Sequence, residues 1–149
     1  MRHAHWMDFA LTEAREAGAA GEVPVGAALV CDGAVVARAG NTREAAADPL
    51  GHAELSVLRA AATALGRWRL AGCTLYVTLE PCPMCAAAAV QARVDRIVFG
   101  AQDPRLGACG SVWSLAQAPE WHHRVEIVGG VREQEAAELL REFFAGRRS

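Results

Sequence analysis

The segment CTLYVTLEPCPMC (residues 73–85) joins a strand pattern to a helix pattern with almost no loop between them. Apolar side chains alternate through its first half around Leu75 and Val77, which is typical of a strand that packs against a core. After Pro81 the sequence becomes rich in alanine, and a helix is predicted to about Arg93. A strand followed directly by a helix is the repeating unit of α/β proteins.

Similar patterns on either side of this segment predict the remaining elements. Further strands are expected over residues 23–31, 34–37, 96–100 and 125–128, and further helices over residues 6–20, 51–65, 111–117 and 132–144. Asp32-Gly33 between two apolar runs predicts a hairpin, which makes one edge of the sheet antiparallel. Helical crossovers favour parallel pairing elsewhere. The predicted fold class is α/β, a three-layer α/β/α sandwich around a mixed five-stranded sheet.

Composition limits the classes of function. The chain has 149 residues and no evident linker, so residues 1–149 are expected to form one domain. Its net charge is −2 and all 15 basic residues are arginine, so any recognition of nucleic acid must be local. No apolar run approaches the roughly 18 residues that span a membrane, and the N-terminus lacks the apolar core of a signal peptide. No membrane partner and a cytoplasmic location are therefore expected.

The cysteines indicate a metal site. There are five, an odd number in a chain without an export signal, so a disulfide framework is not expected. Cys82 and Cys85 are three residues apart at the start of a predicted helix, where they share a face and the helix dipole favours thiolates. Sulfur ligands of this kind typically bind zinc. Alone, the pair would equally fit a redox site or half of a structural zinc site.

A second motif extends this interpretation. His52-Ala53-Glu54 opens the helix predicted from residue 51, and H-x-E followed by P-C-x-x-C is the signature of zinc deaminases. His52, Cys82 and Cys85 are predicted to hold zinc and to leave the fourth position to water. Glu54 is predicted to take the proton of that water and deliver it to a ring nitrogen and to leaving ammonia. The alternative for Glu54 is a carboxylate that only stabilises the start of its helix.

From about Trp6 to Phe144 the chain resembles the cytidine-deaminase-like zinc enzymes and, among them, the bacterial tRNA-specific adenosine deaminases. The two zinc motifs are common to the superfamily, whereas residues 98–101, 103–105 and 107–111 carry the more specific likeness. The resemblance implies deamination of adenosine to inosine at the wobble position (34) of a tRNA anticodon, with arginine tRNA as the expected substrate. It implies that zinc hydroxide attacks C6 of a flipped adenine while Glu54 shuttles protons. It further implies one zinc ion per subunit and a homodimer.

The same resemblance suggests residues that contact the substrate. Asn41 is expected to bind the purine edge through its amide, and the backbone N–H of Ala53 is expected to help hold the base. Candidate contacts to the anticodon stem-loop are Asp103, Arg105, His123 and Arg124, with Arg141, Arg147 and Arg148 as candidates for phosphate contacts. Each has an ordinary alternative: an Asx turn for Asn41 and a solvated surface charge for each arginine.

Several roles stay open on the sequence alone. Glu80 fits either a group that orients a metal ligand or a helix cap. Trp121 fits either base stacking or packing beneath the terminal helix, and packing is favoured. The role of His122 is not indicated. Two other functions compete: a guanine or other free-base or nucleoside deaminase, against which residues 103–111 weigh, and a structural zinc module, which would not need Glu54.

Overall fold

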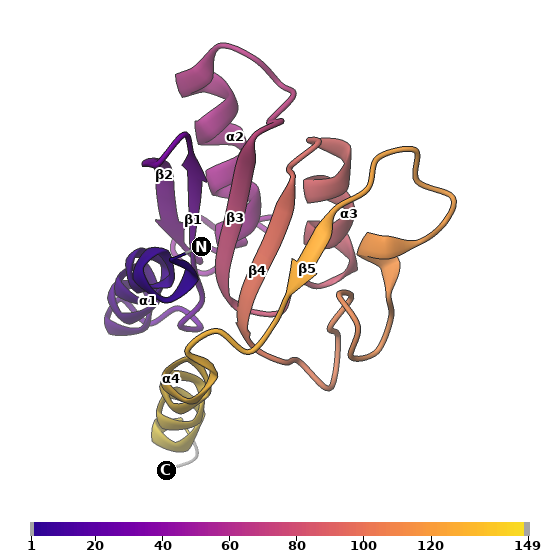
Figure 1. The fold of residues 1–149 in the computed structure, drawn as a ribbon. Coiled ribbons are helices and arrows are strands. Elements are labelled where there is room, and N and C mark those ends of the chain that lie inside the picture. Colours follow the sequence, from indigo (N-terminus) through magenta and orange to yellow (C-terminus); the bar gives the residue numbers. More distant parts are fainter. Residues whose placement is uncertain (1, 148–149) are drawn as a thin grey trace.

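A mixed sheet of five strands forms the centre of the computed structural model, which describes residues 2–147 (Figure 1). The strand order is β2-β1-β3-β4-β5. The strands are β1 (Gly26–Cys31), β2 (Ala34–Gly40), β3 (Cys73–Leu79), β4 (Arg96–Ala101) and β5 (Glu126–Val128). The helices are α1 (His3–Ala19), α2 (Ala53–Leu65), α3 (Pro83–Gln91) and α4 (Glu133–Gly146), with a short 3₁₀ helix η1 (Leu115–Gln117). Within residues 2–147 no helix is both long and apolar enough to cross a membrane.

Helices cover both faces of the sheet. On one face, α2 and α3 pack on side chains such as Leu29, Leu75 and Ile97. On the other, α1 and α4 pack on Tyr76 and Val98, the strand neighbours of Leu75 and Ile97. This alternation gives each face its own core, because successive residues of a strand point to opposite sides. The predicted three-layer α/β/α sandwich is therefore confirmed (Figure 1).

One strand pairing differs from the prediction. Parallel pairing is found for β3 with β4 and for β4 with β5, as expected, but β1 pairs antiparallel with β3 as well as with β2. The reason is the place of the crossover: α2 connects β2 to β3, two strands that run in the same direction but flank β1. The prediction of parallel pairing everywhere outside the hairpin is therefore wrong for this one pair.

This topology brings the two zinc motifs together. Because β2 and β3 run in the same direction, the helices that follow them both begin at the same end of the sheet, where these strands have their carboxyl ends. Asn41 follows β2, His52 precedes α2, and Cys82 precedes α3. Open α/β sheets bind ligands at the carboxyl ends of their strands. The chain thus places the motif residues where that rule expects a site.

Leu75 of the central strand β3 is fully buried in the core. Leu75→Ala is expected to lower the free energy of unfolding by about 2–5 kcal/mol, because it removes buried methyl groups and leaves a cavity. Chemical denaturation followed by circular dichroism measures the change. Leu50→Ala is the control, since Leu50 is 51% exposed, and should change stability by less than about 0.5 kcal/mol. Equal effects of the two substitutions would contradict this description of the core.

Candidate metal centre and active site

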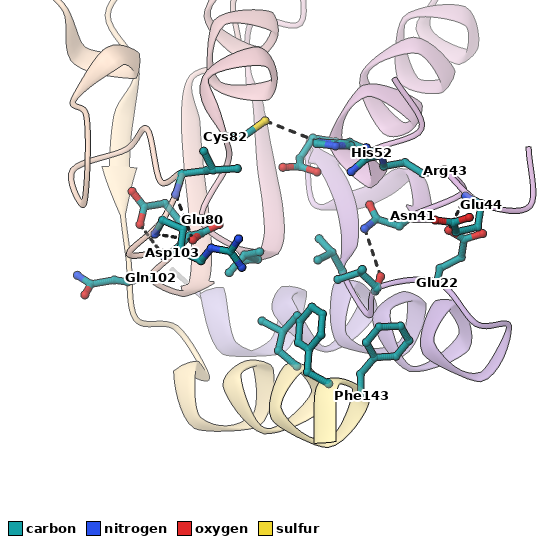
Figure 2. Close-up of a pocket in the computed structure, with 18 of the residues that line it drawn as sticks. Glu22, Asn41, Arg43, Glu44, His52, Glu80, Cys82, Gln102, Asp103 and Phe143 are labelled. Carbon is teal, nitrogen blue, oxygen red and sulfur yellow. Dashed lines mark hydrogen bonds between the residues drawn. The ribbon is translucent and has the colours of Figure 1, made fainter. Parts of the chain in front are cut away.

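Three side chains with metal-binding atoms converge at the starts of α2 and α3. His52 and Cys82 each occupy the position immediately before a helix, in extended backbone, and Cys85 lies in the first turn of α3. Nδ1 of His52 is 3.7 Å from Sγ of Cys82 (Figure 2). It is 3.3 Å from Sγ of Cys85. Tetrahedral zinc with ordinary bond lengths places nitrogen and sulfur ligands about 3.5–3.8 Å apart. The three residues therefore fit a zinc ion.

The pKa values of the two thiols are shifted in opposite directions. A hydrogen bond from Cys85 lowers the pKa of Cys82 to about 4, and the same interaction, together with burial, raises the pKa of Cys85. The hydrogen bond between Cys82 and His52 raises the pKa of the imidazole. These interactions favour the thiolate form of Cys82, which is the form that binds a divalent cation.

Glu54 lies beside this group. It is in the first turn of α2, only 4% exposed, and faces the same cavity as His52 and Cys82. Burial raises the pKa of Glu54 to about 7. A buried carboxyl whose pKa lies near neutrality is suited to take up and release a proton, which is what a general acid–base group does.

A cavity of about 610 Å³ extends from these residues. His52 and Cys82 lie at one end and Phe143 at the other (Figure 2). The remaining walls come from the segments around Glu22, Asn41 and Asp103. This volume lies within the range typical of small-molecule and cofactor sites. The cavity has room for a nucleobase next to the His/Cys/Cys group.

Comparison with known proteins identifies the family. Residues 1–101 match the cytidine and deoxycytidylate deaminase zinc-binding region. The tRNA-specific adenosine deaminase of Agrobacterium fabrum is 51% identical over 144 residues, which cover 97% of this chain and 95% of the relative. The chain belongs to the zinc-dependent deaminases, among the tRNA-specific adenosine deaminases.

Solved structures support the same family assignment. A structure from work on tRNA:A34 deaminases that edit A to I at the wobble position is 51% identical, with a TM-score of 0.88, and the match covers 91% of this chain and 99% of that one. A guanine deaminase from Bacillus subtilis is 31% identical, with a TM-score of 0.68, and the match covers 100% of this chain and 96% of that one. Both sequence and shape therefore lie nearer to the A34 deaminase than to this guanine deaminase.

Asn41 connects two segments of the deaminase. Its Oδ1 accepts a hydrogen bond from the backbone N–H of Ala53 at 3.1 Å, and its Nδ2 donates to the carbonyl of Val23 at 3.2 Å. The alternative of an Asx turn within its own loop does not fit these partners. The two groups expected to hold the base thus hold each other, and a base would have to exchange or share this bond. Their role in substrate binding stays a prediction.

Glu80 has a third role that neither sequence interpretation anticipated. It is 2% exposed and accepts hydrogen bonds from the backbone N–H groups of Asp103, Cys109 and Ser111 and from the Ser111 hydroxyl. Burial alone would raise the pKa of Glu80, but these hydrogen bonds outweigh it and hold the pKa below its usual value. The carboxylate therefore organises a loop rather than capping a helix or orienting a metal ligand.

Glu22 also organises a loop, on the other side of the cavity. This role was not predicted from the sequence. Glu22 is 3% exposed, and its two oxygens accept the backbone N–H groups of Glu44 at 3.0 Å and Ala45 at 2.7 Å. A carboxylate next to the apolar run from Val23 was the available signal. A buried charge needs hydrogen-bond partners, so this neighbourhood indicates that Glu22 has some, but it does not indicate which residues they are.

The four candidate RNA contacts fall into two separate pairs. Asp103 and Arg105 line the cavity, whereas His123 and Arg124 do not. Nε2 of His123 lies 2.7 Å from the carbonyl of Val94, before β4, and the Arg124 guanidinium donates to two carbonyls of its own loop. The cavity lies at the opposite end of β4, whose six residues span about 20 Å. The four residues therefore do not form one surface around the cavity of a single chain.

The C-terminal arginines also differ from one another. Arg147 lines the cavity, where it stacks on Phe143 at 4.3 Å and donates to the carbonyl of Gly21 at 2.8 Å. Arg141 is exposed and does not line the cavity, and Arg148 lies outside the described residues.

Trp121, in the loop before β5, is used for packing. It packs against the core that α2 and α3 cover, and its indole N–H donates to the carbonyl of Leu115 at 2.7 Å. Packing rather than base stacking is therefore observed, but on this face of the sheet and not beneath the terminal helix α4. His122 beside it is exposed.

Proposed function

We propose that this deaminase hydrolyses adenosine to inosine at wobble position 34 of a tRNA anticodon, with arginine tRNA as its substrate. The observation that carries the proposal is the convergence of His52, Cys82 and Cys85 with buried Glu54 at one end of a cavity. The similarity to tRNA-specific adenosine deaminases over nearly the whole chain supports adenosine in tRNA rather than a free base.

In the proposed reaction His52, Cys82 and Cys85 hold one zinc ion per subunit. Zinc, when bound, lowers the pKa of a coordinated water toward neutrality and so supplies the nucleophile for hydrolysis. Glu54 takes a proton from the water and passes it to the ring nitrogen next to C6. A second proton goes by way of Glu54 to the amino group, which leaves C6 as ammonia while the ring keeps the oxygen.

The remaining assignments concern recognition. Asn41 and the N–H of Ala53 hold the purine edge, and Asp103 and Arg105 contact the RNA that flanks the adenosine. Asn41 suits this role because its amide offers both a donor and an acceptor. We also propose that residues 1–149 form a single domain, that the enzyme is a cytoplasmic homodimer, and that His123 and Arg124 contact RNA away from the cavity.

A substrate panel tests the proposal directly. Zinc-loaded protein incubated with an ACG-anticodon stem-loop, guanine or cytidine is expected to form inosine in the stem-loop and to leave the small molecules unchanged. Chromatography of the digested RNA and of the free compounds measures each product. Turnover of guanine or cytidine without turnover of the stem-loop would overturn the proposed substrate.

Two further RNAs sharpen the result. A stem-loop with guanosine in place of adenosine 34 should release no ammonia, which shows that position 34 is the site of reaction. A stem-loop with the same anticodon in an unrelated stem should react more slowly if arginine tRNA is selected. Equal rates for the two stems would contradict that selectivity.

A further inference from the structure

We propose that Glu80 is a positioning residue: it fixes residues 103–106 at the cavity and thereby sets how tightly RNA around the target adenosine is held. The inference rests on the proposed function, because it concerns the RNA bound at that site. Within the described residues, Glu80 makes no hydrogen bond to the expected metal ligands; its hydrogen bonds go to Asp103, Cys109 and Ser111. It acts through the loop that it organises.

The first observation is that one carboxylate holds both ends of this loop. Oε1 accepts the backbone N–H of Asp103 at 3.0 Å (Figure 2) together with the Ser111 hydroxyl. Oε2 accepts the N–H groups of Cys109 at 3.0 Å and Ser111 at 3.1 Å. The side chain is 2% exposed, so water competes little for these bonds. The loop from Asp103 to Ser111 is therefore closed around the Glu80 carboxylate.

The second observation is the close approach of Gly107. A Cβ atom at this position would lie 2.5 Å from each carboxylate oxygen of Glu80. The backbone N–H of Gly107 donates to the carbonyl of Asp103 at 2.9 Å, which closes the turn. Only a residue without a side chain leaves the carboxylate in place, so the loop and Glu80 fit each other closely.

The third observation links Glu80 to the cavity wall. With its N–H held by Glu80, Asp103 accepts through Oδ1 the backbone N–H groups of Arg105 at 2.9 Å and Leu106 at 3.2 Å. Arg105 and Leu106 both line the cavity, and both are exposed to solvent. Glu80 thus determines where two exposed side chains stand at the mouth of the site.

The loop is also tied to the metal-ligand segment. The backbone N–H of Ala108 donates to the carbonyl of Pro81 at 2.9 Å, and Cys82 follows Pro81 directly. Glu80 precedes the same segment. Residues 103–106 are therefore held at a set place relative to the group that would bind zinc, so RNA that binds this loop is held beside that group.

Glu80→Gln and Gly107→Ala test the proposal independently. Glutamine keeps the shape but replaces one acceptor oxygen by an N–H₂ group that faces N–H donors; alanine pushes the intact carboxylate away. Each variant is expected to raise the Kd for a fluorescent anticodon stem-loop by at least about 10-fold, since charge-assisted hydrogen bonds are lost. The single-turnover rate at saturating RNA should change less than about threefold, because the chemistry is untouched. Zinc content should stay as in the wild type.

Leu11→Ala is the matched control for stability. Leu11 belongs to α1, is fully buried in the core between α1 and the sheet, and does not line the cavity. Its truncation should therefore lower stability without altering the loop. Its Kd should equal that of the wild type at a temperature where all variants are folded. If Leu11→Ala weakens RNA binding as much as Glu80→Gln, the effect is one of stability and the proposal fails.

The other outcomes are equally distinct. A Kd within twofold of the wild type for both Glu80→Gln and Gly107→Ala overturns the proposal, and so does a loss of zinc or of the saturated rate in Glu80→Gln. Gly107→Ala decides the matter alone if Glu80→Gln does not fold. Wild-type protein that binds the stem-loop but does not deaminate it would contradict the proposed function, whereas the effect of Glu80 on Kd would still be measured.

Discussion

Glu54→Gln is expected to lower the rate of adenosine deamination by at least about 10²-fold while the protein keeps its zinc. The carboxylate is 4% exposed, lines the cavity, and follows His52 by two residues in the first turn of α2. Glutamine has nearly the same size and still accepts a hydrogen bond, but its amide takes up no proton near neutral pH. The proton of the attacking water then has no carrier to the ring nitrogen. Single-turnover deamination of the anticodon stem-loop measures the loss.

Glu133→Gln is the matched control. Glu133 also lies in the first turn of a helix, α4, but it is exposed and does not line the cavity. If Glu54 only stabilised the start of α2, both substitutions would cost about 0.3–1 kcal/mol of stability and leave turnover unchanged. Unchanged turnover in Glu54→Gln would remove this residue from the mechanism and favour a structural zinc module.

The features that the sequence predicts well are those encoded over short distances. The segment around β3 and α3 contains both a strand pattern and the candidate metal ligands, so the sequence predicts Cys82 and Cys85 at a helix start without knowledge of the fold. His52 is 30 residues away, but it also stands before a helix that follows a strand. Helices that follow strands of the same direction begin at the same end of the sheet, so the two motifs are expected to lie close together.

The features that the sequence did not predict depend on contacts between distant segments. Glu80 meets Asp103, Cys109 and Ser111 across separations of 23 to 31 residues, and Glu22 meets its partners across 22 and 23. No local pattern encodes such bonds, because every residue type except proline has a backbone N–H group that can donate a hydrogen bond. Only the three-dimensional loop conformation decides which of them face a carboxylate.

The same reason explains the separation of His123 from the cavity. This residue was grouped with Asp103 because both lie in segments of the family likeness. The sheet, however, places the start of β5 beside the start of β4, and the cavity beside the end of β4. The strand pairing of β1 with β3 escaped prediction similarly, since a crossover helix fixes the direction of two strands but not which strand lies between them.

Cys85→Ser is expected to reduce bound zinc from about one ion per chain to less than about a tenth and to abolish turnover, because an alcohol does not ionise near neutral pH and replaces a thiolate poorly. Cys85 is fully buried, and its Sγ lies 3.3 Å from Nδ1 of His52, inside the group that would hold the metal. Elemental analysis of the purified variant and the stem-loop assay measure the two losses. Chelation of the wild-type enzyme should give the same inactive state, and added zinc should restore the wild type only.

Cys31→Ser distinguishes this effect from a general consequence of losing a buried thiol. Cys31 is also buried, but it ends β1, at the edge of the sheet away from the helix starts, and is not part of the His/Cys/Cys group. The control should keep both its zinc and its activity. The thermal midpoint adds a third measurement: a metal that binds only the folded state raises stability by RT ln(1 + [Zn]/Kd). Zinc should therefore raise the midpoint of the Cys31→Ser variant and leave that of Cys85→Ser unchanged. Equal zinc content and equal midpoints in the two variants would exclude Cys85 as a ligand.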